Sequence, residues 1–254
     1  MKNSLIKIGA DDTPAEPKVE KIIYLISRHS AQNRDDFASL MKHDIASQLL
    51  ATEPLGLQLN LADDAVAAGD TMAMESIASR SHAVVSVWLH SSINRLPIEK
   101  ILAASGANFA GYLVSESCPL RSATNTISAG ERTPGFAQVA LLQRPARLSV
   151  EDWIDIWQNS HTQIAIATQS TFSYTQNLVV RPLTANAPKI DAIVEESFPI
   201  EALTDQAVFY DTRGDDEKLA QNSQAMMASC ARFIDFDKIN VCPTSEYSYK
   251  SLQL

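Results

Sequence analysis

The stretch NRDDFASLMKHDI at residues 33–45 has a counterpart in SVEDWIDIWQNSH at residues 149–161, 116 positions later. Each stretch begins with a good N-cap residue and carries acidic residues in its first turn, which is typical of a helix start. Apolar side chains follow at helical spacing. Phe37 and Met41 of the first stretch correspond to the two tryptophans of the second. The chain is therefore predicted to contain a duplicated unit.

The segments that flank these helices extend the duplication. β-branched and aromatic residues that alternate with polar ones predict strands on both sides of each helix. In the first half the strands are expected at 21–29, 54–61, 82–90 and 109–117, and the helices at 33–49 and 97–105. In the second half the strands are expected at 136–145, 172–180, 191–198 and 236–242, and the helices at 149–168 and from 200 onward, with a break near Gly214. Both halves have the order β-α-β-β-α-β.

This order predicts an α+β fold built from two ferredoxin-like units. Because helices cover only one face of each sheet, the other face has to be buried as well. We expect the two units to pack sheet to sheet as an intramolecular α+β barrel. The expected division is a flexible arm at 1–19, a degenerate first unit at 20–121, a linker at 122–135 and a second unit at 136–254.

Composition narrows the class of function. The 254 residues include 21 Lys and Arg and 30 Asp and Glu, which gives a formal charge of −9. Such a balance argues against binding of nucleic acid or of an anionic membrane surface. The three cysteines form no disulfide framework, and no signal peptide or membrane span is predicted. We expect a soluble cytoplasmic protein that is a monomer (a pseudo-dimer) or a homodimer.

His161 is the most informative single residue. It follows Trp157 by four positions and Trp153 by eight, so all three share the helix face that should be buried. Burial would favour a neutral imidazole, which suits a general base or a hydrogen-bond donor. A core histidine that is satisfied by a backbone carbonyl is the alternative. The first half has Ile45 at this position, although His43 or His29 could line a separate pocket.

Two strands of the second half carry further polar candidates. In the strand at 172–180, Tyr174 and Gln176 point to one face and Asn177 to the other. Either group could orient a carbonyl or hydroxyl oxygen, or simply lie on a partly exposed face. Glu195 and Glu196 are consecutive, so one of them should point inward or towards a helix. A buried glutamate there would be a candidate proton carrier, and an edge-strand charge is the alternative.

No sequence motif for a metal, a phosphate or a catalytic serine is present. The five histidines lack the spacing of metal ligands, and we expect no metal and no cofactor. A haem bound through His161 is the least favoured of the functions considered.

These motifs resemble the EthD domain family of the dimeric α+β barrel superfamily. The resemblance extends over the chain as a tandem pair, at about 21–120 and 136–249, and the second copy is the closer. The family has a tryptophan and a histidine one turn apart, which correspond to Trp157 and His161. It also has a Tyr-x-Gln-Asn strand, here YTQN at 174–177, that is often followed by a histidine. Leu178 stands at that place here, and the first copy lacks the helix histidine.

The resemblance implies a pocket enzyme that acts on apolar or aromatic carbonyl compounds, since related barrels include lactone isomerases, oxygenases without cofactor, dehydratases and haem-binding enzymes. We expect a cofactor-independent isomerase or lyase (dehydratase) of a catabolic or polyketide-type pathway. Its substrate would be an apolar carbonyl, lactone or hydroxy compound. His161, Tyr174 and Asn177 are the candidate catalytic residues. The candidate substrate-binding residues are Trp153, Trp157, Gln176 and Glu195. A cofactor-free monooxygenase and a non-catalytic accessory protein that binds an apolar intermediate are the alternatives.

Overall fold

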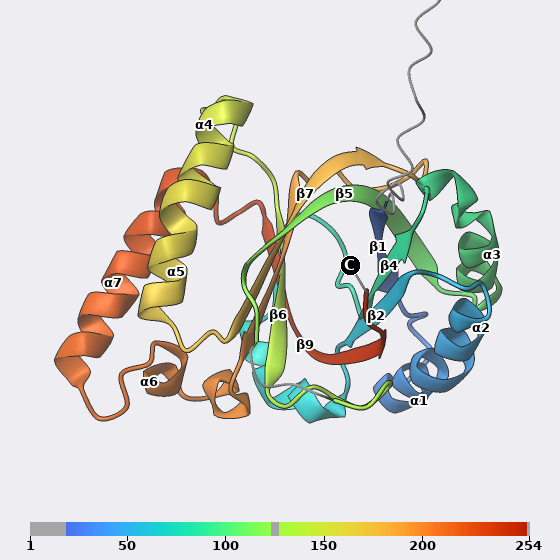
Figure 1. Ribbon diagram of the computed structural model, residues 1–254. Coiled ribbons are helices and arrows are strands. Elements are labelled where there is room, and N and C mark those ends of the chain that lie inside the picture. Colours follow the sequence, from blue (N-terminus) through green and yellow to red (C-terminus); the bar gives the residue numbers. More distant parts are fainter. Residues whose placement is uncertain (1–18, 123–126, 253–254) are drawn as a thin grey trace, which may run out of the picture.

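Eight antiparallel strands close into a barrel in the computed structural model, which describes residues 19–122 and 127–252. The order around the barrel is β2-β4-β1-β5-β7-β8-β6-β9, and β9 pairs with β2 to complete the ring. The short strand β3 (Met74–Glu75) adds to β9. Figure 1 looks along the barrel, so that the strands surround its interior and the helices lie outside.

Each half of the chain supplies four neighbouring strands of the ring. The first half contributes β1 (Glu20–Ser27), β2 (Gly56–Leu61), β4 (Ala83–Leu89) and β5 (Asn108–Leu120). The second half contributes β6 (Phe136–Leu142), β7 (Ser173–Pro182), β8 (Ala192–Phe198) and β9 (Ile239–Lys250). In both halves the last strand lies beside the first, the first beside the third, and the third beside the second. The ferredoxin-like description of each half stays a prediction.

The two halves meet through backbone hydrogen bonds and not only through side chains. We expected two separate sheets packed face to face, whereas β5 pairs with β7 and β2 pairs with β9. The result is one continuous sheet that curves back on itself. An unpaired edge strand exposes a row of backbone donors and acceptors, and closure of the ring removes this cost at both junctions.

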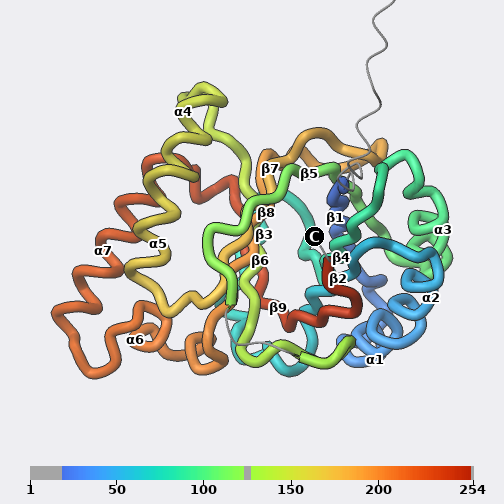
Figure 2. Tube along the Cα trace, viewed as in Figure 1, coloured from blue at the N-terminus to red at the C-terminus, as the bar shows by residue number. Residues whose placement is uncertain are grey.

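Helices cover the barrel on two opposite sides, as Figure 2 shows. On one side lie α1 (Arg34–Leu40), η1 (Met41–Ile45), α2 (Ala46–Leu50) and α3 (Leu96–Ala104), the last preceded by the turn η3 (Ser92–Arg95). On the other side lie α4 (Val150–Ile154), η4 (Asp155–His161), α5 (Thr162–Thr168), η5 (Ile200–Leu203), α6 (Gln206–Phe209) and α7 (Asp216–Phe233). The 3₁₀ segment η2 (Asp64–Met72) and β3 were not predicted.

Because side chains alternate along a strand, each strand directs one set of side chains towards the helices and the other set into the barrel. On β1, Ile22 and Tyr24 pack beneath the first helical layer, while Ile23 and Leu25 fill the barrel interior. On β8, Ala192 and Val194 pack beneath the second helical layer. The molecule therefore has a core inside the barrel and another core between the barrel and each helical layer.

The two helices that the sequence matches to each other share an unusual geometry. η1 and η4 are π-helical segments, and they lie 116 positions apart at their last residues, Ile45 and His161. π segments are rare and occur often at functional sites. The first copy ends its π segment on an apolar residue and the second on a histidine.

The arm and the linker that the sequence predicted lie only partly within the residues that the structure describes. The predicted arm at 1–19 lies outside them except for Val19, and the predicted linker at 122–135 includes the undescribed residues 123–126. The rest of that linker runs along β9, where the Thr133 backbone N–H donates to the Glu246 carbonyl. Within the described ranges, no helix has the length and apolar character needed to cross a bilayer.

Candidate active site

The segments α4, η4 and α5 follow one another without a break and form one continuous helix. The helix face that carries the two tryptophans and His161 is turned towards the sheet. Ser149 caps its start by accepting a hydrogen bond from the Asp152 backbone N–H. Trp153, Trp157 and His161 are all buried, so the helical spacing predicted this face correctly. At the π segment the Thr162 N–H bonds to the Trp157 carbonyl, which also accepts the Thr162 hydroxyl at 2.8 Å.

His161 is held between the two long helices. Its Nδ1 lies 3.0 Å from the Ser229 Oγ on α7, and its ring centroid lies 4.6 Å from that of Phe233. Burial, with the Arg232 guanidinium adding to it, lowers the pKa of His161 to about 4. The imidazole is therefore neutral at pH 7, as the sequence predicted, and it carries one N–H donor and one acceptor nitrogen. Its polar partner is a side-chain hydroxyl and not a backbone carbonyl.

The two indoles differ in their hydrogen bonding. Trp153 Nε1 donates to the Phe233 carbonyl at 3.0 Å, which ties α4 to the end of α7. Trp157 Nε1 is fully buried but has no hydrogen-bond partner among the described residues. The Trp157 indole nevertheless lies close enough to the Tyr174 hydroxyl to act on the pKa of that group. A buried N–H without an acceptor is costly, so it marks a place where an oxygen could be bound.

Tyr174 and Gln176 form the sheet side of the same layer. Gln176 Nε2 donates to the Thr162 Oγ1 at 2.6 Å, which joins β7 to α5. Burial, with the Glu196 carboxyl adding to it, raises the pKa of Tyr174 far above its usual range. The phenol therefore keeps its proton and acts as a hydrogen-bond donor at any physiological pH.

Glu196 is the functional candidate that the sequence did not single out. It is the β8 partner of Tyr174 in the sheet register, so both side chains point into the helix-covered layer. Only 6% of Glu196 is exposed, and its Oε1 has no hydrogen-bond partner within residues 19–122 and 127–252. Burial raises the pKa of Glu196 to about 7. A carboxyl group with this pKa can both take up and release a proton near neutral pH.

Residues on α7 connect Glu196 with His161. The Glu196 charge contributes to raising the pKa of the Cys230 thiol to about 12, after the larger effect of burial. The preceding residue, Ser229, contacts His161. The two titratable groups therefore lie in one buried layer, against the same turn of α7.

Asn177 and Glu195 do not belong to this layer. Both point into the barrel interior, where Asn177 Nδ2 donates to Glu195 Oε1 at 3.0 Å. The grouping of Asn177 with Tyr174, and of Glu195 with the indoles, was therefore wrong as a single site. Alternation along β7 and β8 puts these residues on the face opposite to Tyr174 and Glu196. The sequence offered no signal to select Glu196 over Glu195, because the pairing of Glu196 with Tyr174 depends on the strand register.

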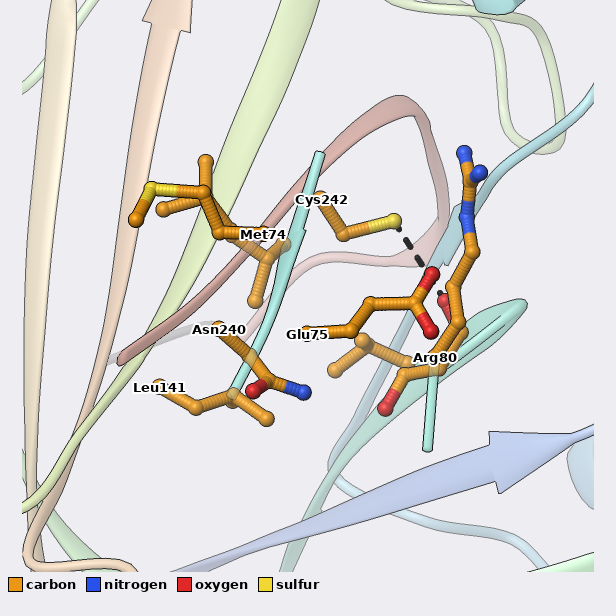
Figure 3. A pocket seen from close by; sticks show the side chains of 10 residues that line it. Met74, Glu75, Arg80, Leu141, Asn240 and Cys242 are labelled. Carbon is orange, nitrogen blue, oxygen red and sulfur yellow. Dashed lines mark hydrogen bonds between the residues drawn. The ribbon is translucent and has the colours of Figure 1, made fainter. Parts of the chain in front are cut away.

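The cavity in Figure 3 lies elsewhere, where β3 and β9 meet the barrel interior. Met74, Glu75 and Arg80 line it together with Cys242, whose thiol donates to the Ser81 carbonyl at 3.4 Å. Its volume of about 10 Å³ is the room of one water molecule. It is too small for an organic substrate. The part of the chain that the structure describes contains no group of three or more His, Cys, Asp or Glu placed to hold a metal ion.

Residues 145–237 match the EthD domain family. The matched segment includes α4 to the end of α7, so it contains His161, Tyr174 and Glu196. The family model does not extend to the first half, so a tandem pair of EthD domains stays a prediction. No curated protein sequence matches the chain.

Solved structures resemble the whole barrel and not only the segment that matches this family. An anthrone oxidase-like protein has a TM-score of 0.51 at 9% identity, over 94% of this chain and 96% of that one. A Fusobacterium nucleatum protein proposed to be a monooxygenase has a TM-score of 0.46 at 10% identity, over 92% and 98%. A chlorite dismutase variant from Candidatus Nitrospira defluvii has a TM-score of 0.41 at 10% identity, over 91% and 92%. These neighbours are of the dimeric α+β barrel type, and at such identities the likeness shows the fold alone.

Proposed function

We propose that the protein is an enzyme that moves protons on an apolar or aromatic carbonyl, lactone or hydroxy compound, as an isomerase or a lyase. The site is the helix-covered layer of the EthD domain. The observation that carries the proposal is a pair of buried polar atoms beside Tyr174, the Trp157 Nε1 donor and the Glu196 Oε1. Glu196 Oε1 has no hydrogen-bond partner among the described residues, and the only group found to interact with Trp157 Nε1 there is the adjacent Tyr174 hydroxyl, outside good hydrogen-bond geometry. A bound carbonyl compound would supply a partner to each.

The carbonyl oxygen would accept hydrogen bonds from the Trp157 N–H and the Tyr174 O–H. When a proton leaves the neighbouring carbon, negative charge develops on that oxygen, and two fixed donors in a dry layer stabilise it. Tyr174 suits this role because burial holds its pKa far above neutrality. It therefore donates a hydrogen bond without losing its proton.

Glu196 would take the proton from the carbon. With a pKa of about 7, a useful fraction of the carboxyl is ionised at neutral pH, and the protonated form can return the proton. Return of the proton to a different carbon gives isomerisation. Donation of a proton to a departing hydroxyl group gives water and an unsaturated product.

His161 would be the second proton carrier of the layer. Ser229 Oγ at 3.0 Å from Nδ1 fixes the ring, which leaves Nε2 to face a substrate. If Nδ1 accepts from Ser229, Nε2 carries the proton and donates a hydrogen bond to the substrate oxygen. In the other tautomer Nε2 acts as a base.

The surrounding side chains restrict the substrate to apolar compounds. Trp153, Trp157 and Phe233 are at most 1% exposed, and they fill the space beside the imidazole. A substrate would enter by displacing these aromatic side chains, while helix α7 moves away from the sheet. A charged substrate would lose its hydration there without a matching countercharge.

We further propose that the reaction needs no cofactor, haem included. The Phe233 ring, whose centroid lies 4.6 Å from that of the imidazole, occupies one side of His161. A ring packed at this place does not fit a macrocycle on His161. A Soret band that forms when haem is added to wild type and not to His161→Ala would contradict this.

The test is a substrate panel of lactones, enones, aromatic hydroxy-carbonyls and apolar ketones, with product masses measured in air and without oxygen. An isomer of unchanged mass, or loss of water, in both atmospheres supports the proposal. Glu196→Gln should then abolish turnover, whereas the exposed Glu217→Gln should leave it intact. Retention of a compound through gel filtration without any product would instead indicate an accessory binding protein.

A cofactor-free monooxygenase is the second candidate. The neighbour with a TM-score of 0.51 is described as anthrone oxidase-like. The same donors and base would generate a substrate carbanion, which would then react with oxygen. A product that gains oxygen in air and does not form without it would favour this reading over isomerisation.

A further inference from the structure

A chain of hydrogen bonds runs from the first half of the barrel to the helix that carries His161. Ser117 Oγ on β5 donates to Gln176 Oε1 on β7 at 2.9 Å. Gln176 Nε2 donates to Thr162 Oγ1 at 2.6 Å, and Thr162 Oγ1 donates to the Trp157 carbonyl at 2.8 Å. β5 and β7 form one junction between the two halves and run side by side in Figure 1. The first half therefore reaches the candidate site of the second half.

The donors and acceptors of this chain all point in one direction. A hydroxyl has a single proton, and Thr162 directs it to the Trp157 carbonyl. Thr162 Oγ1 is then left as the acceptor for Gln176, whose own carbonyl oxygen accepts from Ser117. Hydrogen bonds aligned in this way polarise one another and become stronger. Thr162 and Gln176 are at most 3% exposed, so water does not compete for the bond between them.

The chain ends at the groups that the proposed function uses to bind the substrate oxygen. The Trp157 carbonyl accepts the Thr162 hydroxyl and also the Thr162 backbone N–H, which closes the π-helical turn. The same tryptophan carries the buried indole N–H. The Thr162 hydroxyl also lies close enough to the Tyr174 hydroxyl to act on the pKa of that group. Both proposed oxygen-binding donors therefore lie beside Thr162.

The first half of the chain shows that the π-helical turn does not need this hydroxyl. Ala46 stands 116 positions before Thr162, and its backbone N–H closes the corresponding turn by bonding to the Met41 carbonyl. An alanine has no hydroxyl, and at the preceding position Ile45 replaces His161. The turn thus forms without a side-chain hydrogen bond, and the hydroxyl is present in the half that carries the candidate site.

We propose that Thr162, Gln176 and Ser117 are positioning residues that hold the Trp157 indole and the Tyr174 hydroxyl in place for the substrate oxygen. Gln176 then acts through Thr162 and does not contact the substrate, because both ends of its amide are engaged in the chain. The catalytic consequence rests on the proposed function. The positions of the side chains can be tested without any substrate.

The test compares Thr162→Val with Thr168→Val. Both remove a hydroxyl from α5, but Thr168 Oγ1 donates to the Ile164 carbonyl of its own helix and is not part of the chain. We expect Thr162→Val to shift the ¹H–¹⁵N NMR signals of the Trp157 indole and the Gln176 side-chain amide. Thr168→Val should leave both signals unchanged. Thr162→Ser, which keeps the hydroxyl, should restore them.

Turnover provides the second measurement, on the compound that the substrate panel identifies. Thr162→Val should lower kcat by about 10²-fold with little change in KM, since a small misplacement of fixed donors acts on the transition state. Thr162→Ser should recover most of this loss. Thr168→Val should keep the wild-type kcat.

Ser117→Ala is a further variant in case Thr162→Val fails to fold. Ser117 is exposed and begins the chain, and the exposed Ser115, two positions earlier on β5, supplies the control Ser115→Ala. Ser117→Ala should shift the Gln176 amide signal and lower kcat by up to about tenfold, because one bond of the chain is lost. Ser115→Ala should do neither.

Two results would each overturn the positioning role: an unchanged Trp157 indole signal in Thr162→Val, or an equal loss of kcat in Thr162→Val and Thr168→Val. If wild type turned over no compound of the panel, the proposed function would fail. The Trp157 signal would still decide whether the hydrogen-bond chain positions the indole.

Discussion

Glu195 and Glu196 are consecutive on β8 and equally buried, yet they lie in different layers of the molecule. Glu195 points into the barrel, where it meets Lys21, Gln58 and Asn177. Glu196 points under the helices towards Tyr174. The same residue type therefore forms an ion pair on one face of the sheet and a carboxyl with a pKa of about 7 on the other.

Glu196→Gln should stabilise the fold above neutral pH while it removes activity. The raised pKa means that the contribution of Glu196 to stability is present below pH about 4.5 and is lost as pH rises through about 7. A shift from 4.5 to about 7 corresponds to roughly 3 kcal/mol. Urea unfolding at pH 8 should therefore show the variant to be more stable than wild type, and at pH 4 the two should be alike.

Glu195→Gln is the matched comparison. Its charge faces Lys21 and accepts bonds from Gln58 and Asn177, so the substitution should cost about 1–3 kcal/mol of unfolding free energy at pH 8. If Glu196→Gln raises the unfolding free energy at pH 8 and Glu195→Gln lowers it, the two carboxyl groups lie in different environments. Destabilisation of similar size by both would show that Glu196 is also ionised and paired.

His161→Asn should lower kcat on the compound that the panel identifies by about 10² to 10⁴, the usual range for a lost proton carrier. His43→Asn, in the first half, should retain wild-type turnover. If His43→Asn lost activity and His161→Asn kept it, the active layer would be in the first half. Steady-state kinetics at pH 7 with both purified variants would decide.

The lowered pKa of His161 predicts that the folded protein loses stability at acid pH. Its pKa is lowered to about 4, so its contribution is present above pH about 6.5 and is lost as pH falls through about 4. Wild type should therefore lose stability between these values, and His161→Asn should lose less. Melting temperatures measured from pH 7 to pH 4 test this, and parallel curves for the two proteins would contradict it.

Comparing Trp157→Phe with Trp153→Phe distinguishes a loss of stability from a loss of activity. Both remove a fully buried indole N–H, but Trp153 Nε1 is bonded to the Phe233 carbonyl. Trp153→Phe should lose about 1–2 kcal/mol more unfolding free energy, because that carbonyl is left without its donor. Trp157→Phe should cause the larger fall in kcat. A reversed pattern in urea unfolding and turnover would remove Trp157 from the proposed oxygen site.

We also propose that the chain is a monomer, because both halves contribute strands to one closed ring and the barrel needs no second copy. Light scattering of the purified protein should give a mass near 27.8 kDa. A mass of about twice that value, stable on dilution, would show that another surface pairs two chains.

Secondary structure was predictable where periodicity was strong. The helix expected at 149–168 is observed over α4, η4 and α5, and the strand expected at 191–198 is β8. Two kinds of feature were missed. η2 and β3 are too short to give a period, and β9 continues to Lys250, beyond the predicted end at 242. Its last part pairs with β2 of the other half, and such a long-range partner leaves no local signal.

The sequence by itself determined that Trp153, Trp157 and His161 share a buried helix face, since helical spacing fixes relative direction along one element. It also determined that Glu195 and Glu196 point apart. Only the tertiary structure decided which glutamate lies under that helix, because the choice depends on which face of the sheet the helices cover. It likewise decided that Lys21 meets Glu195 across 174 positions. Such contacts depend on strand register around a closed ring, and no local pattern encodes that register.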